Sequence, residues 1–220
     1  MMGKNFSNIQ AHVYKADSQR VAYIILPGVE THSWMQQQAR TLNVNIVGIT
    51  GMDWDNDLTP WPAPGQPPGL PAFLGEAPQF LEYLTARLIP RVEKQLGLIA
   101  PERTLIGISL SGLFAVWAWM NGSEFENIAS ISGSMWYEGF VAWLQGKPCP
   151  PKKGRIYFSL GEQEPLTSVA AFRPVGRDTA AVVGYFKSHG VATCFQWNPG
   201  NHYAPLKPRL TKAFVWLYGK

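Results

Sequence analysis

The stretch Gly107-Ile108-Ser109-Leu110-Ser111-Gly112 decides the fold, because it places a serine between small residues where an apolar run passes into a helix-like run. The apolar run covers residues 103–106, and the helix-like run covers residues 113–120. A chain that leaves a strand, turns sharply at a serine and enters a helix needs small residues two positions before and after that serine. We therefore interpret residues 107–112 as a nucleophile elbow with Ser109 as the candidate nucleophile.

The start of the predicted helix also supplies candidate oxyanion donors. Unpaired backbone N–H groups there point toward the serine hydroxyl and stabilise the anion formed on attack at a carbonyl. We expect one donor to be the N–H of Leu110 and the second to be that of Val29 or Gly28, after the first predicted strand. The usual pattern is GxSxG, and Ser111 departs from it, since it is small but lacks the freedom of glycine at positive φ. An ordinary strand-to-helix connection with a serine N-cap is the alternative interpretation.

Composition narrows the class of protein. A chain of 220 residues with 46% hydrophobic content suits one domain with a sizeable core. Cys149 and Cys194 form no CxxC pair and no set with histidines at metal-ligand spacing, so we expect reduced thiols and a cytoplasmic location. No segment approaches the roughly 20 apolar residues that a membrane span requires. We therefore expect no membrane association. We also expect no cofactor.

Charge is a weaker guide to the partner. A net charge of +4 and a pI near 9.1 could attract an anionic substrate. The basic residues are scattered and form no run typical of nucleic-acid binders, so we expect no nucleic-acid partner. Asp53, Asp55 and Asp57 resemble the start of a calcium loop, but Leu58 and Pro64 stand where glycine and glutamate are expected. We therefore expect no metal.

Short β-branched runs alternate with amphipathic stretches along the chain, which predicts a mostly parallel sheet covered by helices. The predicted strands are residues 21–26, 43–49, 103–106, 127–131, 155–160 and 193–197. The predicted helices are residues 77–96, bent at Pro90, and residues 113–120, 177–189 and 206–217. Residues 51–75 are so rich in Pro, Gly, Trp and Asp that they predict a long functional surface loop.

Ligands of such sheets bind beyond the carboxyl ends of the strands. Glu162 and Glu164 follow the 155–160 strand and His202 follows the last strand, so serine, acid and histidine occur in the chain order that α/β-hydrolases use. We prefer Glu164 over Glu162, because Glu164 lies three residues beyond the strand-ending glycine and reaches farther along the loop. Asp178 is a third candidate for the acid.

Four histidines compete for the role of general base. His12 precedes the first predicted strand, and His189 lies in the last turn of a helix, so neither is expected at the site. His32 follows the first strand and could touch the substrate, but it precedes the nucleophile in the chain. We therefore predict that His202 takes the Ser109 proton and returns it to the leaving group, held by a carboxylate.

Several tryptophans follow predicted strands and could form a flat wall for an aromatic or sugar-like substrate: Trp34, Trp54, Trp61 and Trp136. For any one of them, core packing or loop anchoring is the more common role. We single out Trp54 and Trp136, together with His32, as candidates for substrate binding.

The segment between the fourth and fifth predicted strands bears on access to the site. Residues 132–154 are too few for the large helical lid that many lipases insert there. We expect an open site without a large cap, walled by residues 51–75 and 135–144, that favours bulky acyl groups.

Together these residues resemble a known family. Residues 107–114, 132–136 and 159–162 and the His202 loop are similar to those of the esterases related to esterase D and the siderophore (enterochelin-type) esterases. The resemblance covers roughly residues 20–217. It implies an α/β-hydrolase fold and hydrolysis of carboxylic esters, in some relatives those of iron-bound catecholate trilactones, through Ser109 and His202.

Two rival classes stay open. An acyltransferase or peptidase on the same fold would use the same three residues and differ in the acceptor that the acyl-enzyme meets. A catalytically silent, hydrolase-like binding protein is the second, and the departure at Ser111 lends it weight. The natural substrate and the oligomeric state stay open as well.

Overall fold

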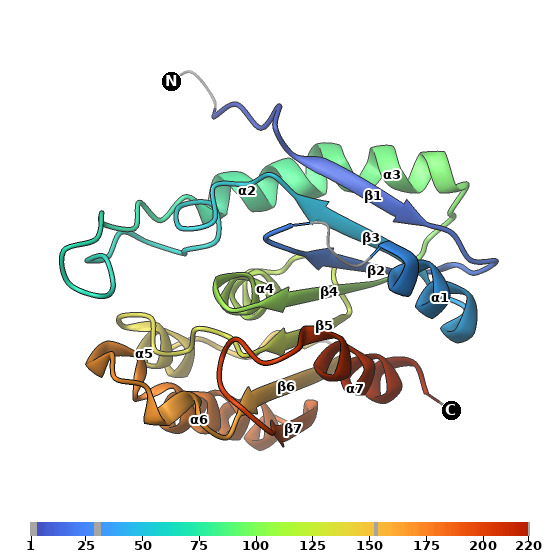
Figure 1. Ribbon diagram of the computed structural model, residues 1–220. Coiled ribbons are helices and arrows are strands. Elements are labelled where there is room, and N and C mark those ends of the chain that lie inside the picture. The colour runs from blue at the N-terminus through green and yellow to red at the C-terminus, as the bar shows by residue number, and fades with distance from the viewer. Residues whose placement is uncertain (1–3, 29–31, 152–153, 220) are drawn as a thin grey trace.

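The sheet orders the whole fold. The computed structural model describes residues 4–28, 32–151 and 154–219. Seven strands form one sheet in the order β1-β3-β2-β4-β5-β6-β7, and every neighbouring pair is parallel except β1 with β3 (Figure 1). The strands are β1 (Gln10–Tyr14), β2 (Arg20–Ile25), β3 (Asn45–Thr50), β4 (Glu102–Ile108), β5 (Asn127–Ile131), β6 (Arg155–Gly161) and β7 (Ala192–Asn198). The predicted mostly parallel sheet is confirmed.

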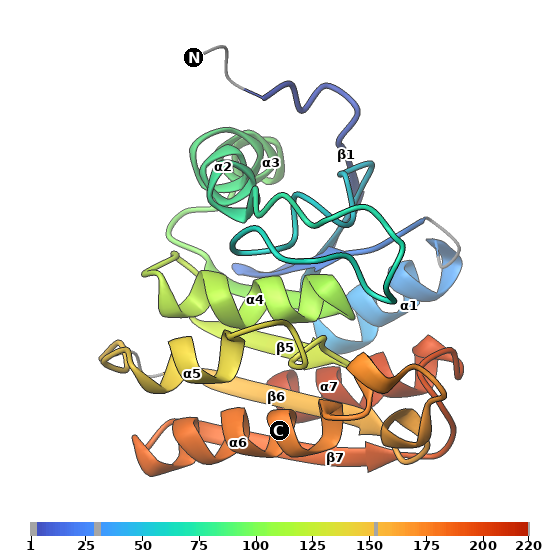
Figure 2. The ribbon, with the colours of Figure 1, turned by 90° about the vertical axis from the view of Figure 1, so that its left-hand side faces the viewer.

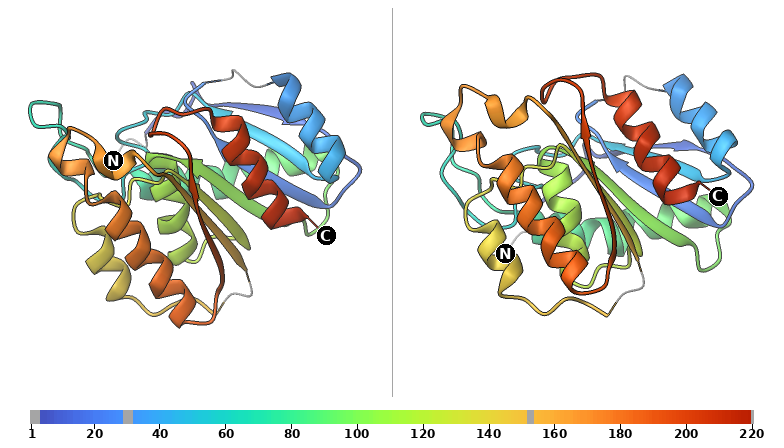
Figure 3. Two further views of the ribbon diagram at one scale, coloured as in Figure 1. Left: turned by 60° about the horizontal axis from the view of Figure 1, so that its bottom comes forward. Right: turned by 90° about the horizontal axis from the view of Figure 1, so that it is seen from below.

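Helices cover both faces of the sheet. One face carries α1 (His32–Leu42) and α7 (Leu206–Tyr218), which lie side by side in Figure 3. The other carries α2 (Ala77–Tyr83), α3 (Ile89–Leu96), α4 (Leu110–Met120), α5 (Phe140–Gln145) and α6 (Val175–Ser188), as Figure 2 shows. Two separate apolar clusters, one on each face, form the core. All eleven residues of α4 are buried, as expected for a helix that is apolar all round.

The predicted helix over residues 77–96 has a wide turn at its middle. A π-helical stretch, Leu84–Leu88, joins α2 to α3 immediately before Pro90. Proline lacks the N–H that would bond four residues back, and its ring clashes with that carbonyl, so the wider turn relieves the conflict. Where the sequence predicts a bend at Pro90, the structure has a π-helical stretch just before that residue.

Two helices, one strand and two short 3₁₀ turns were not predicted from the sequence. Strand β1 is an edge strand whose partly exposed residues show no strong alternation, and it is held by its antiparallel pairing with β3. Helix α1 contains Trp34, one of the tryptophans considered for a substrate wall, and its ring stacks on Phe214 of α7 at 5.9 Å between centroids. Helix α5 and two short 3₁₀ turns, Glu164–Leu166 and Ala170–Phe172, occupy segments expected to be irregular. Among the described residues, no helix is both long and apolar enough to cross a membrane.

Candidate active site

The turn between β4 and α4 has the geometry of a nucleophile elbow. Ser109 has φ 57° and ψ −122°, a backbone conformation that residues other than glycine rarely adopt. A Cβ atom on Gly107 would lie 1.9 Å from the carbonyl oxygen of Ser111, so only glycine fits two residues before the serine. The backbone of Ser109 is therefore strained and sharply turned, and it lies at the N-terminus of α4.

Ser111, the departure from GxSxG, fits its position without strain. It lies in the first turn of α4 and does not have a positive φ, so this position does not need glycine. Its buried hydroxyl accepts a hydrogen bond from the Ile108 N–H at 2.6 Å, and it lies within donating distance of two carbonyls, that of Ile108 at 2.8 Å and that of Ile25 at 3.1 Å. The side chain thus ties the elbow to the end of β2.

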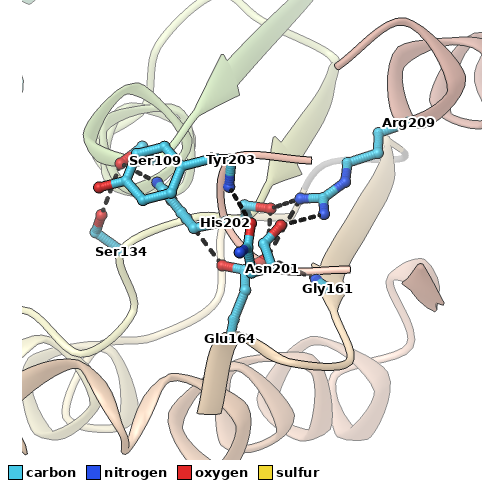
Figure 4. Close-up of polar contacts among 9 residues, drawn as sticks. Ser109, Ser134, Gly161, Glu164, Asn201, His202, Tyr203 and Arg209 are labelled. Carbon is cyan, nitrogen blue, oxygen red and sulfur yellow. Dashed lines mark hydrogen bonds and ion pairs between the residues drawn. The ribbon is translucent and has the colours of Figure 1, made fainter. Parts of the chain in front are cut away.

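Three side chains from distant segments meet at the carboxyl ends of the strands (Figure 4). His202, after β7, places Nε2 3.1 Å from the Ser109 Oγ and Nδ1 2.9 Å from the Glu164 Oε2. Glu164 begins the 3₁₀ turn that follows β6 and is buried. A hydroxyl, an imidazole and a carboxylate are therefore in line, each within hydrogen-bond reach of the next.

The other candidate acids lie elsewhere. Glu162 is exposed. Asp178 lies in the first turn of α6, where its carboxylate accepts a hydrogen bond from the Nε of Arg177 at 2.9 Å. Of the three acids considered from the sequence, only Glu164 contacts His202 in the structure.

The second oxygen of Glu164 is held by a buried network. Its Oε1 accepts hydrogen bonds from the Ser132 hydroxyl and from the Gly161 N–H, both at 2.6 Å. Burial alone would raise the pKa of Glu164, but the hydrogen bonds from His202, Ser132 and Gly161 outweigh it and bring that pKa below its ordinary value. Glu164 is therefore held as a carboxylate.

Sequence reasoning missed Arg209. Its Nη1 donates to the Ser132 hydroxyl and lies 3.3 Å from the Glu164 Oε1, while its Nη2 donates to the Asn201 carbonyl at 2.6 Å. This buried guanidinium joins the acid to the loop that carries His202. The helical spacing of Arg209 with the apolar residues 213 and 217 of the predicted helix was the signal, since it puts the arginine on the buried face.

The lowered pKa of Glu164 predicts an acid-dependent loss of stability. The pKa of Glu164 is lower in the folded protein than in the unfolded chain, where it is ordinarily 4.5. Such a carboxyl contributes its full stabilisation above the unfolded-state pKa, and this contribution is lost as the pH falls through the folded-state pKa. Glu164→Gln should therefore lower the free energy of unfolding at pH 7 by on the order of 2 kcal/mol, because Arg209 loses its buried counter-charge. The difference in the free energy of unfolding between the wild type and this variant should shrink below pH 4.5.

Urea unfolding at pH 7, 5 and 3.5 would measure this deficit. Glu162→Gln is the matched control, since it makes the same change at an exposed position two residues away. A deficit of equal size at all three pH values would contradict the predicted role of the Glu164 charge.

The two candidate oxyanion donors differ in what the structure describes of them. Leu110 is the first residue of α4, where backbone N–H groups have no acceptor within the helix. Val29 lies outside the described residues, and Gly28, just before it, is exposed. A further hydroxyl missed from the sequence, that of Ser134, lies 3.4 Å from the Ser109 Oγ, and the Ser134 N–H donates to the Ser109 carbonyl at 3.0 Å.

The remaining histidines have other contacts. His32 begins α1, where its Nδ1 shares a hydrogen bond with the Tyr14 hydroxyl, and it is not among the described residues that line the cavity at Ser109. His12 contacts the Thr50 hydroxyl, and His189 lies at the end of α6. The structure therefore brings only His202 to Ser109.

A cavity of about 690 Å³ opens at Ser109. Trp54 and Trp136, the two tryptophans predicted to bind substrate, both line it, and Trp136 packs on Phe172 at 4.5 Å between ring centroids. Trp61 instead anchors its loop, since its Nε1 donates to the Glu138 carbonyl at 2.9 Å. Residues 51–75, the loop at the left of Figure 1, contribute one wall.

Comparisons with known proteins agree with this architecture. The uncharacterized protein YbbA of Bacillus subtilis is 29% identical over 192 residues, which cover 84% of this chain and 77% of YbbA. An IroE-like serine hydrolase from Shewanella oneidensis superposes with a TM-score of 0.80 at 18% identity, over 94% of this chain and 75% of that one. The siderophore hydrolase EstA from Aspergillus nidulans superposes with a TM-score of 0.75 at 17% identity, over 96% of this chain and 94% of that one.

The two solved structures establish the fold, which is that of the α/β-hydrolases without a large cap among the described residues. The family described as "Putative esterase" matches residues 13–216, nearly the whole chain. The chain therefore belongs to the Putative esterase family.

Proposed function

We propose that the protein is a serine hydrolase that cleaves carboxylic esters through an acyl-enzyme. The observation that carries the proposal is the contact chain in which Ser109 Oγ, His202 and Glu164 are joined at 3.1 and 2.9 Å. Membership of the esterase family supports an ester as the bond that is broken. The strained elbow supports Ser109 as the nucleophile, since backbone strain is commonly kept at reacting residues.

The contacts define how the proton moves. With the Nδ1–H of His202 donated to Glu164, the Nε2 lone pair accepts the Ser109 proton as Oγ bonds to the ester carbonyl carbon. The oxyanion receives the Leu110 N–H. When the C–O bond breaks, the Nε2–H of His202 protonates the leaving alkoxide. Water then attacks the acyl-enzyme by the same route and releases the acid and Ser109.

The cavity supports bulky or aromatic acyl groups. Its volume of about 690 Å³ exceeds what a short acyl chain fills, and aromatic rings of Trp54, Trp136 and Phe172 line it. Tyr203 and Leu166, at the same cavity, are 91% and 79% exposed, so large groups can extend past them to solvent. EstA is named a siderophore hydrolase, and siderophore-type esters are bulky compounds of the kind that such a cavity suits.

Labelling with a fluorophosphonate probe tests the proposal. The probe bonds to an activated serine, so we expect native protein to be labelled at Ser109 and heat-unfolded protein to remain unlabelled. Peptide mapping locates the adduct, and a panel of p-nitrophenyl and larger aromatic esters then measures turnover. Absence of native labelling would instead favour a silent binding protein.

Labelling without ester turnover would point to acyl transfer or peptide cleavage. Both rival activities use the same three residues, so they differ only in the acyl acceptor or in the bond attacked. Product analysis with added alcohols and amines distinguishes transfer from hydrolysis.

A further inference from the structure

The charge of the cavity differs from the charge of the chain. The protein has 19 Lys and Arg residues and a net charge of +4, which from the sequence alone could attract an anionic substrate. None of these basic residues is among the described residues that line the cavity at Ser109. The acidic lining residues are Asp55 and Glu164, and His202 is the one lining histidine among those described.

The charge of Glu164 is already balanced. Its two oxygens are bound by His202 and by the buried Arg209, which lies behind it and does not line the cavity. A substrate in the cavity therefore meets a compensated carboxylate at this position.

The charge of Asp55 is not balanced. Asp55 lies in the loop that forms one cavity wall, is exposed, and makes no ion pair with any described residue. Burial against the loop, together with the like charge of Asp53, raises the pKa of Asp55, as expected for a carboxylate that lacks a cationic partner. The uncompensated charge that faces a substrate is thus negative.

Arg173 contacts a different part of the cavity lining, residues 167–168. Its Nε donates to the Thr167 carbonyl at 3.0 Å and its Nη2 to the Ser168 carbonyl at 3.4 Å. Thr167 and Ser168 line the cavity, whereas Arg173 does not. Two of its donors therefore hold residues 167–168, and the guanidinium itself is not part of the described cavity lining.

We propose that the cavity selects esters by charge, with Asp55 as the residue that makes it accept cationic and neutral acyl groups and discriminate against anionic ones. The inference rests on the proposed ester hydrolysis and adds the substrate class. The aromatic faces of Trp54, Trp136 and Tyr203, which line the same cavity, suit a quaternary ammonium group as well, because such faces attract cations. Among esters of the siderophore size class, uncharged ones are then preferred over multiply anionic ones such as catecholate complexes of iron.

Three p-nitrophenyl esters of equal chain length test this, with six-carbon acyl chains that end in a carboxylate, a methyl or a trimethylammonium group. For the wild type we expect kcat/KM to be about tenfold higher for the cationic than for the anionic ester, a ratio that falls as salt is added. Asp55→Asn should bring the ratio to about one, and Asp55→Lys should reverse it.

Asp17→Asn is the matched control, since it changes the net charge equally at an exposed position between β1 and β2. It should leave the ratio unchanged. A wild type that hydrolyses the anionic ester as fast as the cationic one, or a ratio that Asp55→Asn does not change, would overturn the inference. Failure to hydrolyse the neutral ester, with no fluorophosphonate adduct at Ser109, would instead overturn the proposed function.

Discussion

Replacing Ser109 by alanine should lower kcat for ester hydrolysis by a factor on the order of 10⁵, with KM changed by less than about threefold. The reason is that the variant keeps the cavity and the oxyanion donor but has no atom that can form the acyl-enzyme. Steady-state kinetics on a p-nitrophenyl ester, with protein purified on unused resin to exclude wild-type carry-over, measure the loss.

Ser134→Ala is the matched control, because its hydroxyl lies 3.4 Å from the Ser109 Oγ but outside the contact chain with His202. This substitution should lower kcat by less than about tenfold. If Ser134→Ala were the more damaging change, the assignment of the nucleophile would be wrong.

The same position carries a stability readout that does not depend on turnover. Because Ser109 has φ 57°, Ser109→Gly should be about 1 kcal/mol more stable than Ser109→Ala, while both are inactive. Urea unfolding of the two variants side by side gives the difference. Equal stabilities would show that the elbow is not strained.

Replacing His202 by glutamine should lower kcat by a factor on the order of 10⁴ to 10⁶, because the Ser109 proton loses its acceptor and the leaving alkoxide its donor. Glutamine keeps a polar side chain of similar length, so the Glu164 carboxylate keeps a hydrogen-bond partner and the fold is retained. The control is His189→Gln, at the end of α6 and away from the cavity, which should leave kcat within about twofold.

The double variant gives the sharper test of the pair. Residues that act as one unit are grossly non-additive, so Ser109→Ala with His202→Gln should be no slower than Ser109→Ala alone, within about threefold. Losses that multiplied instead would mean that the two side chains act independently. The 3.1 Å contact between Nε2 and Oγ would then have no catalytic meaning.

Much of the architecture is encoded locally. The alternation of apolar runs predicts all strands but β1, and the helical spacing of apolar residues predicts the helices that cover the sheet, apart from α1 and α5. The small residues around Ser109 predict the elbow, because only glycine fits at position 107. These features depend on near neighbours in the chain, so a single sequence displays them.

The tertiary structure alone decided what meets at the ends of the strands. It set Glu164 rather than Glu162 or Asp178 against His202 and brought Arg209 from the last helix to the acid. It also placed no Lys or Arg among the described residues that line the cavity, although the chain has a net charge of +4. The order of serine, acid and histidine along the chain can be read from the residues, whereas their partners are known only from the folded backbone. Contact between loops follows from strand order and loop path, and these are long-range properties that local periodicity does not carry.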